Sequence, residues 1–212
     1  DRADAKGLLE AYRNDQIHRV PIKTIDQQIL GTVHRLRARW IKARTAQVNT
    51  LRGLLREFGF TIPQGIEHVV PQVRLLTEDA DAKVPNALRP LLASTCDQIE
   101  SLGEQIKLAE EQLETLAQQT PLVEKLRTIP GIGLIAGTAL PAFVGGVDRF
   151  PTGRHFACYL GLTPSERSSG TRRRLGSISK LGDIYLRMLL IHGARSVLSH
   201  ARRAKSHDRL RA

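Results

Sequence analysis

Residues 88–116 read LRPLLASTCDQIESLGEQIKLAEEQLETL, and this run sets the class of the fold. Its apolar or small positions recur in alternating steps of four and three residues, at Leu88, Leu92, Thr95, Ile99, Leu102, Ile106, Ala109, Leu113 and Leu116. Such a heptad repeat places all its members on one face of an α-helix. Pro90 falls in the first turn, where a helix does not need the missing N–H. The run therefore predicts one long helix with a continuous apolar stripe.

A second long helix is predicted over residues 24–58. Its apolar positions follow helical spacing with a small shift of phase, at Ile25, Ile29, Val33, Leu36 and Trp40, then at Val48, Leu51, Leu55 and Phe58. Gly59 ends the pattern, and Pro63, Gly65 and Pro71 follow it. Two such stripes predict long antiparallel helices or a coiled coil. An intramolecular bundle and a stalk that pairs between protomers explain them equally well, because a heptad does not identify the chain that supplies its partner.

The texture of the chain changes after Thr120, where the predicted elements become shorter and Gly, Pro and Arg become more frequent. Short helices are predicted over residues 122–128, 134–144, 152–160 and 184–199, and a polar, Gly-rich, basic loop over residues 161–182. We therefore predict a mostly α-helical chain with three parts. These are residues 1–20, a long helical coiled-coil region at residues 21–119, and a compact helical domain with a helix-hairpin-helix-like motif at residues 120–212.

The 212 residues carry a formal net charge of +11, from 32 Lys and Arg against 21 Asp and Glu. Arginines cluster between positions 35 and 52 and again after Arg167, which favours nucleic acid as a partner over a merely solvated basic face. Cys96 and Cys158 lack the spacing of a zinc site or a disulfide framework. No apolar run is long enough to cross a bilayer and no secretory leader is recognisable, so we expect a cytoplasmic protein without a membrane partner.

A Pro-Gly-Ile-Gly turn at residues 130–133 joins two of the short predicted helices. In a helix-hairpin-helix motif, glycines let the backbone approach a phosphate, and N–H groups at the start of the second helix point toward it. The basic neighbours Lys125 and Arg127 favour contact with DNA. The other interpretation is a glycine turn between two core helices.

Ser168 and Ser169 lie just before a run of three arginines at residues 172–174. A hydroxyl beside fixed cations suits attack on a phosphodiester, because cations hold the anion and stabilise the charge that grows on it. By composition, such a loop is more often a solvated phosphate-binding loop than a catalytic one. No His–Asp pair accompanies the serines, and we interpret His155 as structural or as a phosphate contact.

Asp1 and Asp4 are one helical turn apart in a segment whose apolar residues, Leu8, Leu9 and Tyr12, also have helical spacing. Two carboxylates can share a divalent cation, but Mg²⁺ sites for phosphoryl chemistry draw on more carboxylates. The spacing alone favours surface acids at a helix N-terminus. Because the sequence begins at Asp1 without Met, already inside this pattern, we expect a piece of a longer polypeptide.

Several motifs in a fixed order resemble one family. They are TIPGIG at residues 128–133, Arg149-Phe150, YLGLTP at residues 159–164, Ser168-Ser169-Gly170 and Ser179-Lys180. Together they resemble the C-terminal domain of the DEDD-type insertion-sequence transposases, which are the bridge-RNA-guided transposases or recombinases. Residues 1–5, leading to residues 47–63, are similar to the end of that family's RuvC-like domain and its following coiled coil.

The resemblance implies roles for individual residues. A serine of the loop attacks the DNA backbone and becomes covalently linked to it; Ser169 matches that position, and Ser168 is the alternative. Asp1 and Asp4 match the last two of the four RuvC-like carboxylates that bind Mg²⁺. The residues expected to bind nucleic acid are Pro130, Gly131, Ile132, Gly133, Arg167, Arg172, Arg173, Arg174 and Lys180.

The resemblance also implies partners. The family recombines DNA as a multimer, guided by a structured noncoding RNA, so DNA, a guide RNA and further copies of the chain are expected. The first Asp and the Glu of the metal site are not in this sequence, so we expect the fragment to be inactive by itself. The alternative is a noncatalytic nucleic-acid-binding or oligomerisation module, such as a transposon remnant.

Overall fold

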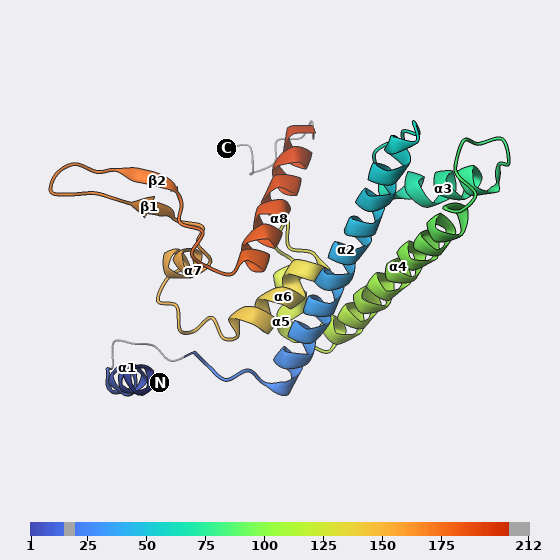
Figure 1. Cartoon of the computed structure of the whole chain (residues 1–212). Helices are drawn as coiled ribbons and strands as arrows, with labels where there is room; N and C mark the ends of the chain where they lie inside the picture. Colours follow the sequence, from blue (N-terminus) through green and yellow to red (C-terminus); the bar gives the residue numbers. More distant parts are fainter. Residues whose placement is uncertain (15–19, 204–212) are drawn as a thin grey trace. The chain divides into compact units, whose positions relative to one another are not determined.

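The computed structural model describes residues 1–14 and 20–203 (Figure 1). Its elements are α1 (Arg2–Arg13), α2 (Ile25–Glu57), the 3₁₀ turn η1 (Ile66–His68), α3 (Val69–Glu78), α4 (Arg89–Gln118), α5 (Pro121–Arg127), α6 (Leu134–Val144), α7 (Gly153–Tyr159), β1 (Pro164–Glu166), β2 (Leu175–Ile178) and α8 (Ile184–Arg203). The predicted mostly α-helical class is confirmed. In the described part of the chain, no helix combines the length and apolar character that a bilayer crossing requires.

The chain divides into two compact units. One is formed by residues 30–119, and the other joins residues 1–29 to residues 120–212. Helix α2 begins in the second of these and continues through the first. The three-part division into residues 1–20, 21–119 and 120–212 stays a prediction.

Helices α2 and α4 of the 30–119 unit run antiparallel. The guanidinium of Arg37 donates from Nε and Nη2 to Oε1 of Glu110, at 2.8 and 2.6 Å. Further along α2, the amide of Gln47 donates to that of Gln98 at 3.2 Å. Because the α2 number rises as the α4 number falls, the helices point in opposite directions. That the two helices form a coiled coil stays a prediction.

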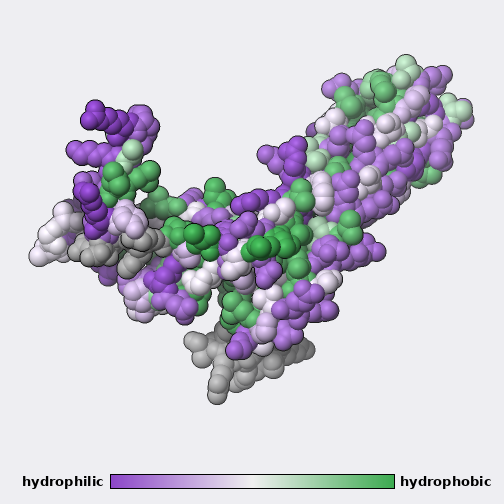
Figure 2. All heavy atoms as spheres, turned by 90° about the horizontal axis from the view of Figure 1, so that it is seen from below, coloured by the Kyte–Doolittle hydropathy of each residue, from purple (hydrophilic) through white to green (hydrophobic). Residues whose placement is uncertain are grey.

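Apolar side chains fill the space between these helices and α3. The buried core of the unit consists of Val48, Leu51, Leu55, Val69, Val73, Val84, Leu92, Cys96 and Ile99. Most heptad positions predicted on α4 are buried, whereas hydrophilic residues cover most of the visible face of this unit in Figure 2. Burial of the stripe, at about 25 cal/mol per Å² of apolar surface, stabilises the pair far more than helix propensity does.

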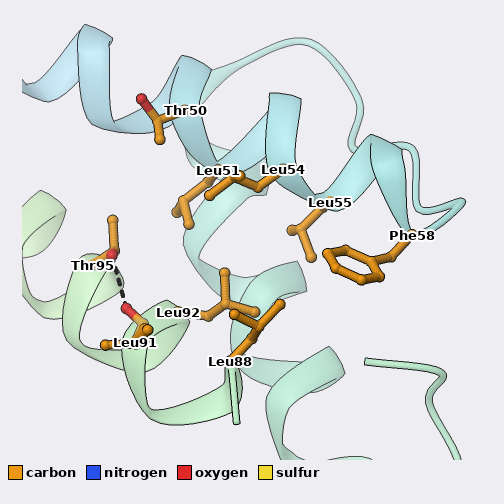
Figure 3. A pocket seen from close by; sticks show the side chains of 9 residues that line it. All are labelled: Thr50, Leu51, Leu54, Leu55, Phe58, Leu88, Leu91, Leu92 and Thr95. Atoms are coloured by element: carbon orange, nitrogen blue, oxygen red, sulfur yellow. Dashed lines mark hydrogen bonds between the residues drawn. The ribbon is translucent and has the colours of Figure 1, made fainter. Parts of the chain in front are cut away.

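A small apolar pocket of about 110 Å³ opens beside this core, between the end of α2 and the start of α4. Leu51, Leu55 and Phe58 point toward Leu88 and Leu92 across it (Figure 3). Among the described residues that line the pocket, none is charged.

The stripe predicted on the first half of α2 is wrong in phase. Ile29 and Leu36 are each 43% exposed, while Leu30 and His34 are buried. The helix is turned so that Arg37, whose side chain is 17% exposed, reaches Glu110 on α4. Apolar spacing alone could not foresee this, because the seam contains a histidine and an ion pair.

Helix α3 is missing from the sequence prediction, because Pro63, Gly65 and Pro71 indicate a segment without helix after Gly59. Pro71 is the third residue of α3, where its missing N–H costs no hydrogen bond. Val69 and Val73 are fully buried on its inner side. Arg52 holds the preceding segment by donating to the carbonyls of Pro63 and Gly65, at 2.6 and 2.7 Å.

In the other unit, α6 packs against α5 and α8. The core consists of Ala139, Leu140, Val144, Leu160 and Leu186, with aromatic residues packed around it. Helix α6 is apolar nearly all round, as expected for a central helix. The predicted short helices correspond to α5, α6, α7 and α8.

His34 makes the stability of the helical pair dependent on pH. Burial, and secondarily the charge of Arg37, lowers the pKa of His34 from 6.5 to about 4. The unfolded chain therefore takes up a proton that the folded chain refuses, so stability is full above the unfolded pKa and falls as the pH drops through the window between the two values. We expect a loss of about 2 kcal/mol between pH 7 and pH 5. Urea unfolding of the wild type and of His34→Leu measures it; equal pH slopes for the two proteins would contradict the prediction.

Candidate nucleic-acid interface on the β-hairpin

The polar loop predicted over residues 161–182 is wrong, because this segment forms a two-stranded antiparallel hairpin. Pro164 pairs with Ile178 and Glu166 with Leu175, with an irregularity between these pairs. Ser169 and Arg172 bridge the tip through two backbone bonds of 3.2 and 3.1 Å. Gly170, at a φ of 55°, supplies the left-handed residue that a two-residue turn needs. In Figure 1 the strands extend away from α7 and α8 of their own unit.

The pairing divides the side chains of the hairpin between two faces. The N–H of Arg167 donates to the carbonyl of Arg174 at 2.9 Å, two residues back from the Ser169–Arg172 pair. Paired residues in an antiparallel ladder share a face, and successive residues alternate. One face therefore carries Ser169 with Arg167, Arg172 and Arg174, and we call it the serine face. The other face, which we call the glutamate face, carries Glu166 with Ser168, Arg173 and Leu175.

Ser168 is built into the hairpin. Its hydroxyl donates to Oε1 of Glu166 at 2.7 Å and accepts the backbone N–H of Arg174 at 3.0 Å. The serine oxygen thus occupies the place of a ladder carbonyl. Removing the hydroxyl would leave a backbone donor of the tip without its partner.

Ser169 is exposed at the tip, and within the described residues its hydroxyl makes no hydrogen bond. Its backbone is fixed by the two bonds to Arg172. The side chains of Arg167, Arg172 and Arg174 are exposed as well. A free hydroxyl therefore lies on the same face as three guanidinium groups.

On the glutamate face, Nε of Arg173 lies 3.7 Å from Oε1 of Glu166. Both side chains are largely exposed, so this ion pair contributes little to stability. It does cancel the formal charge of that face. Glu166 could not be predicted as a site residue from the sequence, because only the pairing of the strands identifies its partners.

The base of the hairpin is clasped by a residue that the sequence did not reveal. Arg187 of α8 is buried, and its Nη1 donates to the carbonyls of Leu160 and Gly182 at 3.2 and 3.0 Å. A Cβ at Gly161 would lie 2.7 Å from the backbone N of Leu181, so the chain passes itself closely here. Lys180, exposed beside this clasp, has a φ of 58°, uncommon for a residue other than glycine.

The Pro-Gly-Ile-Gly turn joins α5 to α6. Gly131, at a φ of 88°, packs on α8, where an added Cβ would lie 2.8 Å from the carbonyl oxygen of Gly193. Nothing lies within 4 Å of a Cβ at Gly133, and no side chain caps α6 there. Gly131 thus has a packing role in the fold. Phosphate binding by Pro130, Gly131, Ile132 and Gly133 stays a prediction.

Two other residues singled out in the sequence support α7. Nδ1 of His155 lies 2.8 Å from Oγ1 of Thr152, the residue that caps this helix. The guanidinium carbon of Arg149 lies 4.7 Å from the centroids of both Phe150 and Tyr159, two rings that also contact each other. It also donates to the carbonyl of Val144 at 3.0 Å, which ties the end of α6 to α7. His155 therefore has a local structural partner.

Asp1 and Asp4 form a capping box at the start of α1. Asp1 accepts the N–H groups of Ala3 and Asp4 at 2.7 and 3.2 Å, and Asp4 accepts from the amino group of Asp1 at 3.2 Å. Both carboxylates are highly exposed. Within residues 1–14 and 20–203, no group of three or more His, Cys, Asp or Glu side chains could hold a metal ion. Binding of Mg²⁺ by Asp1 and Asp4 stays a prediction.

The chain is similar to known transposases. Residues 123–209 match the model of the family described as Transposase IS116/IS110/IS902. A probable family 20 transposase of Pseudomonas aeruginosa is 38% identical over 199 residues, covering 93% of this chain and 59% of that protein. The transposase for insertion sequence element IS1111A of Coxiella burnetii is 32% identical over 202 residues, covering 95% and 56%. The chain thus spans little more than half the length of these relatives.

Proposed function

Because residues 123–209 match the Transposase IS116/IS110/IS902 family, we propose that the chain takes part in DNA transposition and that Ser169 is the nucleophile that cuts the DNA. The single observation that carries the proposal is the free hydroxyl of Ser169 on a face with three arginines. Since the relatives are much longer, strand exchange is proposed for the complete protein.

The proposed step exchanges one ester bond for another. Oγ of Ser169 attacks a backbone phosphorus and releases its proton to water, while one P–O bond to a neighbouring sugar breaks. The departing sugar oxygen takes up a proton and leaves as a hydroxyl. The seryl phosphodiester retains the energy of the original bond, so attack by another DNA hydroxyl can later reseal the strand and release the serine.

Arginines of the serine face support this step electrostatically. Guanidinium groups hold the phosphate through charge-assisted hydrogen bonds and stabilise the charge that develops on its oxygens. Charge supports Ser169 over Ser168, because the Ser168 hydroxyl lies beside the carboxylate of Glu166, which repels a phosphate, whereas Ser169 shares its face with arginines. A noncatalytic nucleic-acid-binding module would bind DNA through the same arginines without forming an adduct.

We further propose, from the resemblance, that the complete protein binds Mg²⁺ with Asp1, Asp4 and further carboxylates of a RuvC-like domain. Mg²⁺ there would supply Lewis-acid stabilisation of the phosphate. A structured guide RNA and assembly into a homo-oligomer are proposed on the same ground. The net charge of +11 suits polyanionic partners of either kind.

The test is to trap the adduct. The full-length protein is incubated with duplex DNA carrying its insertion-sequence ends, then denatured and digested with nuclease and protease. Mass spectrometry should find a nucleotide linked to the peptide that contains residues 168–169, with the fragment ions placing it on Ser169. Strand exchange without any covalent serine–DNA link would overturn the proposal.

A further inference from the structure

We infer that the hairpin binds DNA through its serine face alone, and that Arg173 is turned away from the DNA as the partner of Glu166. The inference rests on the proposed function and narrows it, because composition made all the arginines of residues 167–174 equal candidates. It assigns the phosphate contacts to Arg167, Arg172 and Arg174.

Charge separates the two faces. The serine face carries three guanidinium groups, and in the described structure none of them forms an ion pair with a carboxylate. The glutamate face carries Arg173 and Glu166, whose formal charges cancel. A phosphate on the glutamate face would meet a carboxylate beside each cation. The polyanion is therefore attracted to one side of the strands only.

The glutamate face also presents the wrong chemistry for a phosphate. Leu175 is 51% exposed there, next to the carboxylate paired with it across the strands. The hydroxyl of Ser168, which could donate to a phosphate oxygen, donates to Glu166 instead. Each polar group on this face is thus partnered within the hairpin.

Geometry gathers the cations of the other face around the reactive hydroxyl. Arg172 stands directly opposite Ser169 across the ladder. Arg167 lies two residues before the serine, and Arg174 pairs with Arg167. Side chains directly opposite in a ladder have Cβ atoms about 5 Å apart, well within the reach of an arginine. A phosphate at the Ser169 hydroxyl would therefore lie among all three guanidinium groups.

Glu166 is then a positioning residue, since it acts on the site through other groups. Its carboxylate holds Ser168, whose oxygen in turn holds the N–H of Arg174. The same carboxylate pairs with Arg173 on the glutamate face, where the alternation of the strand already places that side chain. Without these contacts Arg173 could swing over the edge of the two strands toward the DNA.

The test compares three single substitutions in the full-length protein, Arg172→Gln, Arg174→Gln and Arg173→Gln. The last is a matched control, because it removes the same charge from the same hairpin. Binding to duplex DNA is measured by fluorescence anisotropy at several KCl concentrations. The slope of log K against log[salt] is negative, and Arg172→Gln and Arg174→Gln should each reduce its magnitude by about 1, whereas Arg173→Gln should leave the slope unchanged.

The outcomes separate this inference from the function on which it rests. If Arg173→Gln reduces the magnitude of the slope as much as Arg172→Gln does, or if neither substitution changes the slope, the one-sided interface is wrong. Either result leaves the proposed function standing as long as the Ser169 adduct is trapped. Circular dichroism checks that each variant folds. Glu166→Gln provides a second test of the interface, again by DNA binding. In that variant Arg173 is released, so a further Arg173→Gln change should now weaken binding.

Discussion

We expect Ser169→Ala to abolish the serine–DNA adduct and to lower strand exchange by the full-length protein by about a thousandfold or more, as removal of the proposed nucleophile would. DNA binding by this variant stays within about twofold of the wild type, because the arginines of the serine face are untouched. The alanine keeps the backbone bonds between residues 169 and 172. Adduct trapping and a recombination assay measure the first effect, and anisotropy measures the second.

Ser168→Ala is the matched control for this experiment. It removes the same atom one residue away and releases the N–H of Arg174, so we expect the tip to loosen while the proposed nucleophile, Ser169, is kept. We expect the adduct to form more slowly than in the wild type and still on Ser169. If Ser168→Ala loses the adduct while Ser169→Ala keeps it, the serines have exchanged roles. If Ser169→Ala recombines normally, neither assignment survives.

The long helices could be predicted because their apolar periodicity extends over about thirty residues, so that one polar position does not erase it. The hairpin could not be predicted from the sequence. Its strands contain three and four residues, and its ladder is continued toward the tip by arginines and serines, which are not strong strand formers. Pairing across the ladder, which no local pattern reveals, overrides that weak preference here.

The candidate site likewise has features that the sequence predicts and features that it does not. Ser169 and the run of arginines stand out in the sequence by chemistry and by family motif. Their sorting onto two faces does not, because a shift of register by one residue would exchange the faces. Glu166 and Arg187 escaped notice for a related reason. Each acts through hydrogen bonds to groups that only the folded chain brings within reach.

The second large effect is expected far from the hairpin, at Gly193 in the middle of α8. An alanine there would place its Cβ against the carbonyl oxygen of Gly131 and 3.1 Å from the carbonyl carbon. In the described structure this contact is between two backbones, so no flexible side chain can move aside. Separation of the turn from α8 would disturb the apolar core shared by α6 and α8. We expect Gly193→Ala to cost about 3 kcal/mol of the free energy of unfolding.

Helix propensity predicts the opposite sign, which makes the experiment sharp. Alanine is favoured over glycine inside a helix by roughly 0.5–1 kcal/mol. Gly53→Ala on α2, where nothing lies within 4 Å of the new Cβ, should therefore stabilise the chain. Urea unfolding followed by circular dichroism compares the two, and hydrogen exchange should place the loss caused by Gly193→Ala in α5, α6 and α8. If both variants are more stable than the wild type, Gly131 and Gly193 are not in contact.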